Sequence, residues 1–190
     1  YVQLSNFKSA ESDFEKFFAK NQNSGEAAYL LAYSQYYLDK LEDAEKNFLK
    51  AKSLNHKDVN LYYFLGVIKF NQEKYSEAIE FYNEAIKIDA KHVFSYNDRA
   101  SANRMLENYD AAISDYSKAI ELDAYNPLLY NNLGSVKRLN KDYAGAIEAF
   151  DHALRIDRDY FLAINNKGIT LYDQGKYQED GRHRLSRHWT

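Results

Sequence analysis

The sequence repeats with a period of 34 residues, and this period restricts the fold more than any other feature. Similar blocks of sequence begin at Tyr62, Tyr96 and Tyr130. Four further series keep the same register: Ala44, Ala78, Ala112 and Ala146; Ala51, Ala85, Ala119 and Ala153; Phe48, Tyr82, Tyr116 and Phe150; and the small residues Ala32, Gly66, Ala100, Gly134 and Gly168. Series that share one register without an insertion predict a stack of similar structural units.

Each unit has the pattern of two amphipathic helices. Apolar residues recur at spacings of three and four, as in Tyr75, Ala78, Ile79, Tyr82, Ala85 and Ile86. One helix pair cannot bury its apolar face alone, so neighbouring pairs must stack to complete the core. Most of the 18 tyrosines are therefore predicted to pack between helices. A single proline and seven glycines disfavour an all-β fold, which needs many turns.

This period and the order of aromatic and small residues resemble the tetratricopeptide repeat, a helix–turn–helix unit. The resemblance covers nearly the whole chain. It implies an all-α fold, an α-α superhelix in which antiparallel helix pairs stack into a solenoid. Two residues depart from the pattern, because Arg99 and Lys167 replace the leucine that precedes the small residue. The usual proline between repeats is also absent, and the lone Pro127 follows Asn126 as a predicted helix start.

The register predicts the boundaries of the repeats. Residues 1–24 hold the second helix of an incomplete repeat, four full repeats span 25–58, 59–92, 93–126 and 127–160, and a truncated repeat spans 161–180. Residues 181–190 lack the periodicity and carry Arg182, Arg184 and Arg187. We interpret this tail as a cloning or frameshift product, with a native basic arm as the alternative. The chain starts with Tyr1 and its only methionine is Met105, so we expect a section of a longer solenoid.

Composition excludes several classes of protein. The absence of cysteine excludes disulfides, thiolate zinc sites, iron–sulfur clusters and a cysteine nucleophile. A net charge of −3 disfavours nucleic-acid binding, which depends on a basic surface. No apolar stretch approaches the roughly 20 residues that cross a bilayer, so no membrane span is predicted. These features favour the cytoplasm as the location.

The pattern of polar residues does not predict an enzyme. His56, His92 and His152 lie far apart, and we expect each on a solvated surface rather than at a metal. The glycines stand singly instead of forming a phosphate-binding loop. We therefore predict neither catalytic residues nor a cofactor nor a metal site.

The resemblance implies that binding occurs on the concave wall, which the first helix of each repeat lines. Members of the family hold an extended peptide or a partner's helix there. The corresponding candidate groove residues are Tyr29, Tyr33, Tyr63, Phe64, Asn97, Asp98, Arg104, Asn131, Asn132, Arg138, Asn165 and Asn166, with Leu30, Val67, Ser101, Ser135 and Ile169 beside them.

These candidates differ between the two halves of the chain. The first two repeats present aromatic and aliphatic residues, which predict an apolar pocket or a covered patch. In the later repeats, Asn132 and Asn166 hold the position at which peptide-binding members often carry an asparagine that grips the ligand backbone. Their row resembles the asparagine ladder of O-linked N-acetylglucosamine transferases, although Asp98 interrupts it. The alternative is that these amides only solvate the groove.

We predict a protein-interaction scaffold whose partner is a protein or peptide. Two alternatives stay open: a self-assembly module that forms homo-oligomers through uncapped terminal repeats, and the regulatory arm of a larger enzyme. Co-chaperones of this family that capture a chaperone's carboxyl terminus use Lys and Asn on the first of three helices. Tyr29 and Tyr33 stand at those positions, so capture of a free carboxylate is not expected.

Overall fold

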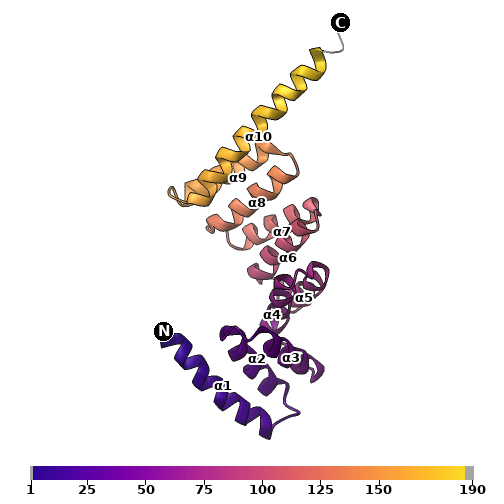
Figure 1. Ribbon diagram of the computed structural model, residues 1–190, viewed down its shortest axis with the longest axis vertical. Helices are drawn as coiled ribbons and strands as arrows, with labels where there is room; N and C mark the ends of the chain where they lie inside the picture. Colours follow the sequence, from indigo (N-terminus) through magenta and orange to yellow (C-terminus); the bar gives the residue numbers. More distant parts are fainter. Residues whose placement is uncertain (1, 187–190) are drawn as a thin grey trace. The chain divides into compact units, whose positions relative to one another are not determined.

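The chain folds into helices throughout the part that is described. The computed structural model describes the backbone of residues 2–186 and the side chains of residues 6–175. Residues 2–186 form ten α-helices and no strand (Figure 1). The helices are α1 (Val2–Lys20), α2 (Gly25–Tyr37), α3 (Leu41–Ser53), α4 (Val59–Asn71), α5 (Tyr75–Ile88), α6 (Val93–Met105), α7 (Tyr109–Leu122), α8 (Pro127–Leu139), α9 (Tyr143–Ile156) and α10 (Phe161–Ser186). The predicted all-α class is confirmed.

The chain divides into two compact units, Tyr1–Ser95 and Tyr96–Thr190. In the first unit, α1 packs on α2, α2 on α3, α3 on α4, and α4 on α5. In the second, α7 packs on α8, α8 on α9, and α10 on both α8 and α9. Pairs of helices that follow each other in sequence are thus the building blocks of each unit. The side chains of the predicted tail, 181–190, lie outside the described residues.

In four successive repeats, the turn after the first helix contains a residue whose backbone lies in the left-handed region. Asp39, Glu73, Glu107 and Lys141 have φ angles of 61°, 60°, 60° and 64°. In each turn the next N–H donates at 2.9 Å to the carbonyl five residues earlier, which is the Schellman arrangement. Gly175 holds the next position of the series, but it has no positive φ and α10 continues through it.

Close contact between small and aromatic residues holds each helix pair together. A Cβ atom added to Gly66 would lie 2.5 Å from a ring carbon of Tyr82, and one added to Gly134 would lie 2.6 Å from the ring of Phe150. Both rings are buried. The two glycines therefore allow the second helix to approach the first at a distance that a larger residue would prevent.

The two charged residues in the family's leucine position form ion pairs. Arg99 binds Asp115 with two bonds, from Nε at 2.8 Å and from Nη2 at 2.6 Å. Lys167 donates from Nζ to Oδ1 of Asp151 at 2.6 Å. Each cation thus has an acidic partner on the neighbouring second helix, which compensates for its partial burial.

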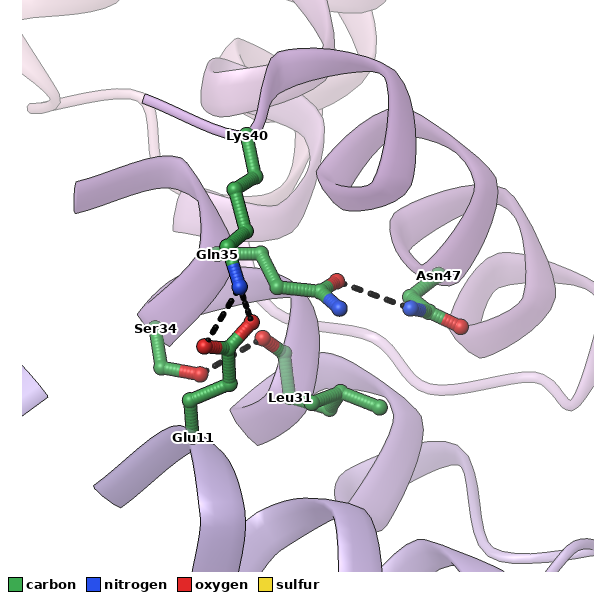
Figure 2. Close-up of polar contacts among 6 residues, drawn as sticks. All are labelled: Glu11, Leu31, Ser34, Gln35, Lys40 and Asn47. Carbon is green, nitrogen blue, oxygen red and sulfur yellow. Dashed lines mark hydrogen bonds and ion pairs between the residues drawn. The ribbon is translucent and has the colours of Figure 1, made fainter. Parts of the chain in front are cut away.

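Polar contacts fix α1 to the turn between α2 and α3 (Figure 2). Glu11 of α1 is buried, and Nζ of Lys40 lies 2.7 Å from both of its carboxylate oxygens. These bonds raise the pKa of Lys40, the hydrogen bond to Glu11 being the largest cause. Nearby, Nδ2 of Asn47 donates to Oε1 of Gln35 at 2.8 Å and joins α3 to α2. These bonds attach α1 to the turn that follows α2, and α3 to α2.

Candidate functional site

Aromatic side chains surround an open pocket of about 430 Å³ in the first unit. We call it the aromatic pocket. Its lining consists of Tyr33, Tyr36 and Tyr37 from α2, Asn60, Tyr63 and Phe64 from α4, and His92 and Phe94 at the start of α6. None of these eight residues is Asp, Glu, Lys or Arg. The pocket therefore offers ring faces and uncharged polar groups.

Helical spacing brings these rings together. Tyr33, Tyr36 and Tyr37 lie three and four residues apart and so share one face of α2. The ring centroid of Phe64 lies 5.6 Å from that of Tyr33 and 4.6 Å from that of Tyr36. Phe64 is only 7% exposed, whereas Tyr37 is 43% and Phe94 62% exposed. Phe64 thus forms the floor of the pocket, and the two exposed rings form its rim.

A residue of α1 supports this rim. The ring of Phe7 stacks on Tyr37 with centroids 4.8 Å apart and an interplanar angle of 6°. Tyr37 also packs against Tyr33 at 4.8 Å. The exposed Tyr37 ring is therefore held on two sides rather than extending freely into solvent.

Two phenol groups of the pocket are linked by a hydrogen bond. The pKa of Tyr33 is raised to about 12, first by its hydrogen bond to Tyr37 and then by burial. The hydroxyl groups of Tyr33 and Tyr37 are thus hydrogen-bonded to each other at the edge of the pocket.

His92 closes one side of the pocket. Its Nδ1 lies 2.7 Å from the hydroxyl oxygen of the buried Ser95. Its ring centroid is 5.2 Å from that of Tyr63 and 5.7 Å from that of Phe94. The imidazole ring is therefore held between Tyr63 of α4 and the rim residue Phe94.

The prediction that the three histidines of the repeats lie on solvated surfaces is wrong. Each is partly buried and packs against a tyrosine. His56 stacks on Tyr29 at 5.0 Å and His152 on Tyr130 at 5.3 Å, while His92 lies in the aromatic pocket. An imidazole ring offers flat apolar faces, and this makes it a packing residue beside the many tyrosines of this chain.

Tyr29, one of the predicted groove residues, lies outside the lining of the aromatic pocket. Its ring packs against Phe48 at 5.9 Å and against His56. Burial is the main cause that raises the pKa of Tyr29 well above its usual range, and the charge of Asp58 adds to it. All four predicted aromatic residues thus belong to the core of the first unit or pack against it, but only Tyr33, Tyr63 and Phe64 also line the pocket.

In the second unit, the predicted asparagines form a chain of hydrogen bonds, which we call the amide ladder. Asn166 donates to Oδ1 of Asn131 at 2.9 Å, and Asn131 donates to Asn132 at 3.5 Å. Asn132 donates to Oδ1 of Asn97 at 3.0 Å, and Asn97 donates to a carboxylate oxygen of Asp98 at 2.7 Å. The ladder joins α10, α8 and α6, and it ends on a negative charge.

The ladder orients the amides without using all their capacity. A carboxamide has two N–H donors and an oxygen with two lone pairs. The bond to Asn97 uses one N–H of Asn132, and both Asn132 and Asn166 are partly exposed. Asn131 is buried and acts between helices, while Asn165 is exposed on α10. The arrangement can therefore present oriented amides to a peptide backbone.

Both predicted groove arginines contact neighbouring groups of the second unit. Nη1 of Arg138 binds Oδ2 of Asp173 at 2.9 Å. Arg104 forms a hydrogen bond to the hydroxyl of Tyr116, which also lies 2.9 Å from the Ser101 hydroxyl. Burial raises the pKa of Tyr116, and these two bonds oppose that change.

Five lining residues of the aromatic pocket were missed by the sequence prediction: Tyr36, Tyr37, Asn60, His92 and Phe94. Tyr36 holds the register position of Arg104 and Arg138, so the period already contained its signal. The others stand at helix beginnings or at a rim position that the repeat pattern does not specify.

Side chains 6–175 include no group of three or more His, Asp or Glu residues placed to hold a metal ion. None of the described helices combines the length and the apolar character needed to cross a membrane.

Three family models match the repeats. They are a tetratricopeptide repeat at residues 59–92, a TPR repeat at 104–140 and a second tetratricopeptide repeat at 128–160. With the register of the sequence and the helix pairs described above, these matches show that the chain belongs to the tetratricopeptide repeat family.

Solved structures share this fold. YrrB is 18% identical with a TM-score of 0.79, and the match covers 88% of this chain and 86% of that one. The C-terminal part of a TPR repeat-containing protein from Cytophaga hutchinsonii is 23% identical with a TM-score of 0.79, covering 93% and 69%. MamA from Desulfovibrio magneticus RS-1 is 18% identical with a TM-score of 0.77, covering 84% and 90%. No match was found among curated protein sequences.

Proposed function

We propose that this chain is a protein-interaction scaffold that holds an extended segment of a partner against the first helices of its repeats. The observation that carries the proposal is the aromatic pocket, which α2 and α4 build from their first-helix side chains. Membership of the tetratricopeptide repeat family supports a scaffold rather than an enzyme. YrrB, a protein of the same fold, is described as a TPR protein with an unusual peptide-binding site.

The exposure of the rim favours a role in binding. Tyr37 and Phe94 keep 43% and 62% of their surface in contact with solvent next to a concave, ring-lined space. Aromatic residues of this kind are enriched among the side chains that dominate binding energy at interfaces. An apolar partner group that enters the pocket would remove these rings from water.

The amide ladder supports the second part of the proposal. Asn132 and Asn166 would donate to and accept from the main chain of the bound segment, because a carboxamide matches a peptide group of any sequence. Their bonds to Asn97 and Asn131 hold them in position before a ligand arrives. Preorganised side chains lose less entropy on binding.

A selection from a library of random short peptides tests the proposal. Peptides selected on the wild-type chain are then measured against Tyr37→Ala, against Asn166→Ala and against the control Tyr125→Ala, which removes an 86% exposed ring outside both sites. We expect binding to weaken with at least one of the first two variants and to persist with the control. Selection of no peptide, or peptides that bind all variants equally, would contradict the proposal.

A second candidate function is self-assembly through α10. Gly168 shares the register of Gly66 and Gly134, but no described atom lies within 4 Å of the position of its Cβ. Phe161, Ile164 and Leu171 on the same helix are 72%, 49% and 50% exposed. We propose that another copy can cover this apolar face. Sedimentation of the wild-type chain and of Leu171→Asp tests this second proposal. We expect the wild-type chain to associate and the substitution to abolish the association. A wild-type chain that stays strictly monomeric at high concentration would contradict the proposal.

A further inference from the structure

Helix α10 has the pattern of a first helix, but the face that a second helix would cover is open. Gly168 continues the series of small residues in which Gly66 meets the buried ring of Tyr82. The earlier members of this series are buried, whereas Gly168 is exposed and no described atom lies within 4 Å of the position of its Cβ. Leu171, about one turn further along α10, is 50% exposed. The group that this face lacks is therefore an aromatic ring of a second helix.

Helix α1 has the opposite pattern, that of a second helix. Phe14 lies 34 residues before Phe48 and continues the aromatic series, and Ala10 and Phe17 stand in the registers of the two alanine series. In the four complete repeats, every residue of these three series is buried. On α1, however, Ala10 and Phe14 are only partly buried and Phe17 is 44% exposed. The side of α1 that would meet a first helix is thus open to solvent.

The contacts of α1 with the first full repeat use another side of the helix. Phe7 stacks on a ring of α2, and Glu11 binds the lysine of the turn that follows α2. Because an α-helix has about 3.6 residues per turn, Ala10 and Phe17 lie around the helix from Phe7 and Glu11. A further helix can therefore pack on Ala10 and Phe17 while α1 keeps its contacts with α2.

The residues that follow α10 in this sequence do not have the pattern of a second helix. The register places Asp180, Arg184 and Arg187 where the complete repeats have alanine, an aromatic residue and alanine. Folding this segment back onto α10 would bury charged side chains, which is costly. The backbone of α10 also continues as one helix through Gly175, the turn position, to Ser186. This segment therefore does not complete the repeat that α10 begins.

We infer that α1 of a second copy packs on α10 and completes its repeat. Phe14 would then lie against Gly168, and the contact between two chains would repeat the one that joins α4 to α5 and α8 to α9 within a chain. Each chain offers one face of either kind, so the association is heterologous and can continue head to tail. The pairing rests on the self-assembly proposed above and names the surface that meets α10.

A symmetric contact between two α10 helices is the main alternative. It would cover the face around Gly168, but it would leave Phe14 and Phe17 of α1 open to solvent in both copies. The pairing of α1 with α10 covers both open faces with one kind of contact. Association of either kind depends on concentration, so dilute chains keep these faces open.

Sedimentation of two blocked variants tests the pairing. Phe17→Asp blocks the face of α1, and Leu171→Asp blocks the face of α10. Because head-to-tail association needs one face of each kind, we expect each variant alone to stay monomeric and their mixture to form a species of twice the 22.2 kDa mass of one chain. The wild-type chain should form larger assemblies as its concentration rises. The control Tyr125→Asp changes an exposed ring outside both faces and should behave as wild type does.

Single cysteines test the same contact without adding charge. The chain has no cysteine, so Phe14→Cys and Gly168→Cys each introduce one thiol. The pairing places these two positions against each other in neighbouring chains, close enough for a disulfide. Under mild oxidation, we expect the mixture to form the mixed disulfide faster than either variant links to itself or to the control Tyr125→Cys.

The results that would overturn the pairing also separate it from the functions proposed above. A mixture of blocked variants that stays monomeric, or a mixed disulfide that forms no faster than with the control, refutes the pairing. Self-association that Leu171→Asp abolishes and Phe17→Asp leaves intact indicates the symmetric contact, so self-assembly through α10 would stand and the pairing would not. A wild-type chain that stays monomeric refutes both and leaves the peptide-binding scaffold standing. Circular dichroism verifies the fold of each variant, and both aspartates replace exposed residues, where a substitution costs little stability.

Discussion

The side-chain amide of Asn132 donates to Oδ1 of Asn97 at 3.0 Å and so joins α8 to α6. The two residues are 35 positions apart, one more than the period. The same offset separates Asn166 from Asn131. Neighbouring first helices of the second unit are therefore offset by one residue where they meet. In both contacts, the second residue of one polar pair (Asn132 or Asn166) donates to the first residue of the pair on the preceding first helix (Asn97 or Asn131).

Removal of an amide from the ladder is expected to destabilise the chain. Asn132→Ala should lower the free energy of unfolding by about 1 kcal/mol, because it removes the bond to Asn97 and leaves its acceptor partly buried. Urea unfolding measures this change. Asn165→Ala is the control, since Asn165 is exposed on α10 and should change the value by less than about 0.5 kcal/mol. Equal effects of both substitutions would contradict a structural role of the ladder.

Two glycines in one register should respond oppositely to alanine. Gly66→Ala places a Cβ 2.5 Å from the buried ring of Tyr82, so it should destabilise the chain by about 1–3 kcal/mol. At Gly168 no described atom lies within 4 Å, so alanine should stabilise α10 by about 0.5–1 kcal/mol through its higher helix propensity. Urea unfolding of both variants gives the sign of each change. Destabilisation by Gly168→Ala would show that its Cβ position is occupied in solution.

The left-handed turn residues offer a way to increase stability. Lys141 has a φ of 64°, a conformation that costs a residue with a Cβ about 1 kcal/mol relative to glycine. Lys141→Gly should therefore raise the free energy of unfolding by about 0.5–1 kcal/mol. Asn140→Gly, next to it and with a φ of −77°, should give no gain. Thermal unfolding compares the two variants, and a gain at Asn140 alone would be inconsistent with the turn geometry.

The sequence predicted those parts of the structure that repeat. The small-residue and aromatic series mark a contact between the two helices of a pair, and that contact recurs two repeats further along the chain, as Gly66 with Tyr82 and Gly134 with Phe150 show. The same register singled out Asn132 and Asn166 as candidates. Their bonding partners were not predicted, because the one-residue offset between neighbouring first helices depends on how the repeats stack.

The aromatic pocket was predicted only in part. Tyr33, Tyr63 and Phe64 follow the register, and all three line the pocket. His92 and Phe94 enter it from the beginning of α6, where no periodic pattern applies. The departures from the family pattern also required the structure, since the acidic partners of Arg99 and Lys167 lie on neighbouring helices that only the fold brings together.

A buried ion pair should make the stability of the first unit depend on pH. Nζ of Lys69 lies 2.7 Å from Glu45 and 3.1 Å from Glu77. Burial, the largest influence on Glu45, raises its pKa, but the hydrogen bonds from Lys69 and Gln72 outweigh it and lower the pKa below 4.5. A lowered pKa contributes stability above pH 4.5, and this contribution is lost as the pH falls through the folded-state pKa.

The Glu45→Gln variant tests this contribution. It should lower the free energy of unfolding by about 1–3 kcal/mol at neutral pH, because Lys69 loses its closest partner. The difference from wild type should shrink as the pH falls below 4.5. Glu84→Gln, which breaks an exposed pair with Lys87, should cost at most about 0.5 kcal/mol. Urea unfolding across the acid range measures both, and a difference independent of pH would contradict the assignment.

The phenol pair of the aromatic pocket can be tested by titration. The hydrogen bond to Tyr37 is the main cause that raises the pKa of Tyr33 to about 12, so Tyr37→Phe should return it toward 10.0. Nuclear magnetic resonance of ring-labelled tyrosine follows the titration, with Tyr33→Phe to assign the signal and Tyr125→Phe as a control that leaves the pKa unchanged. Because the protonated phenol is favoured in the folded state, its contribution to stability is complete below pH 10 and is lost as the pH rises through about 12. A pKa that stays near 12 in Tyr37→Phe would mean that burial, and not the bond to Tyr37, causes the shift.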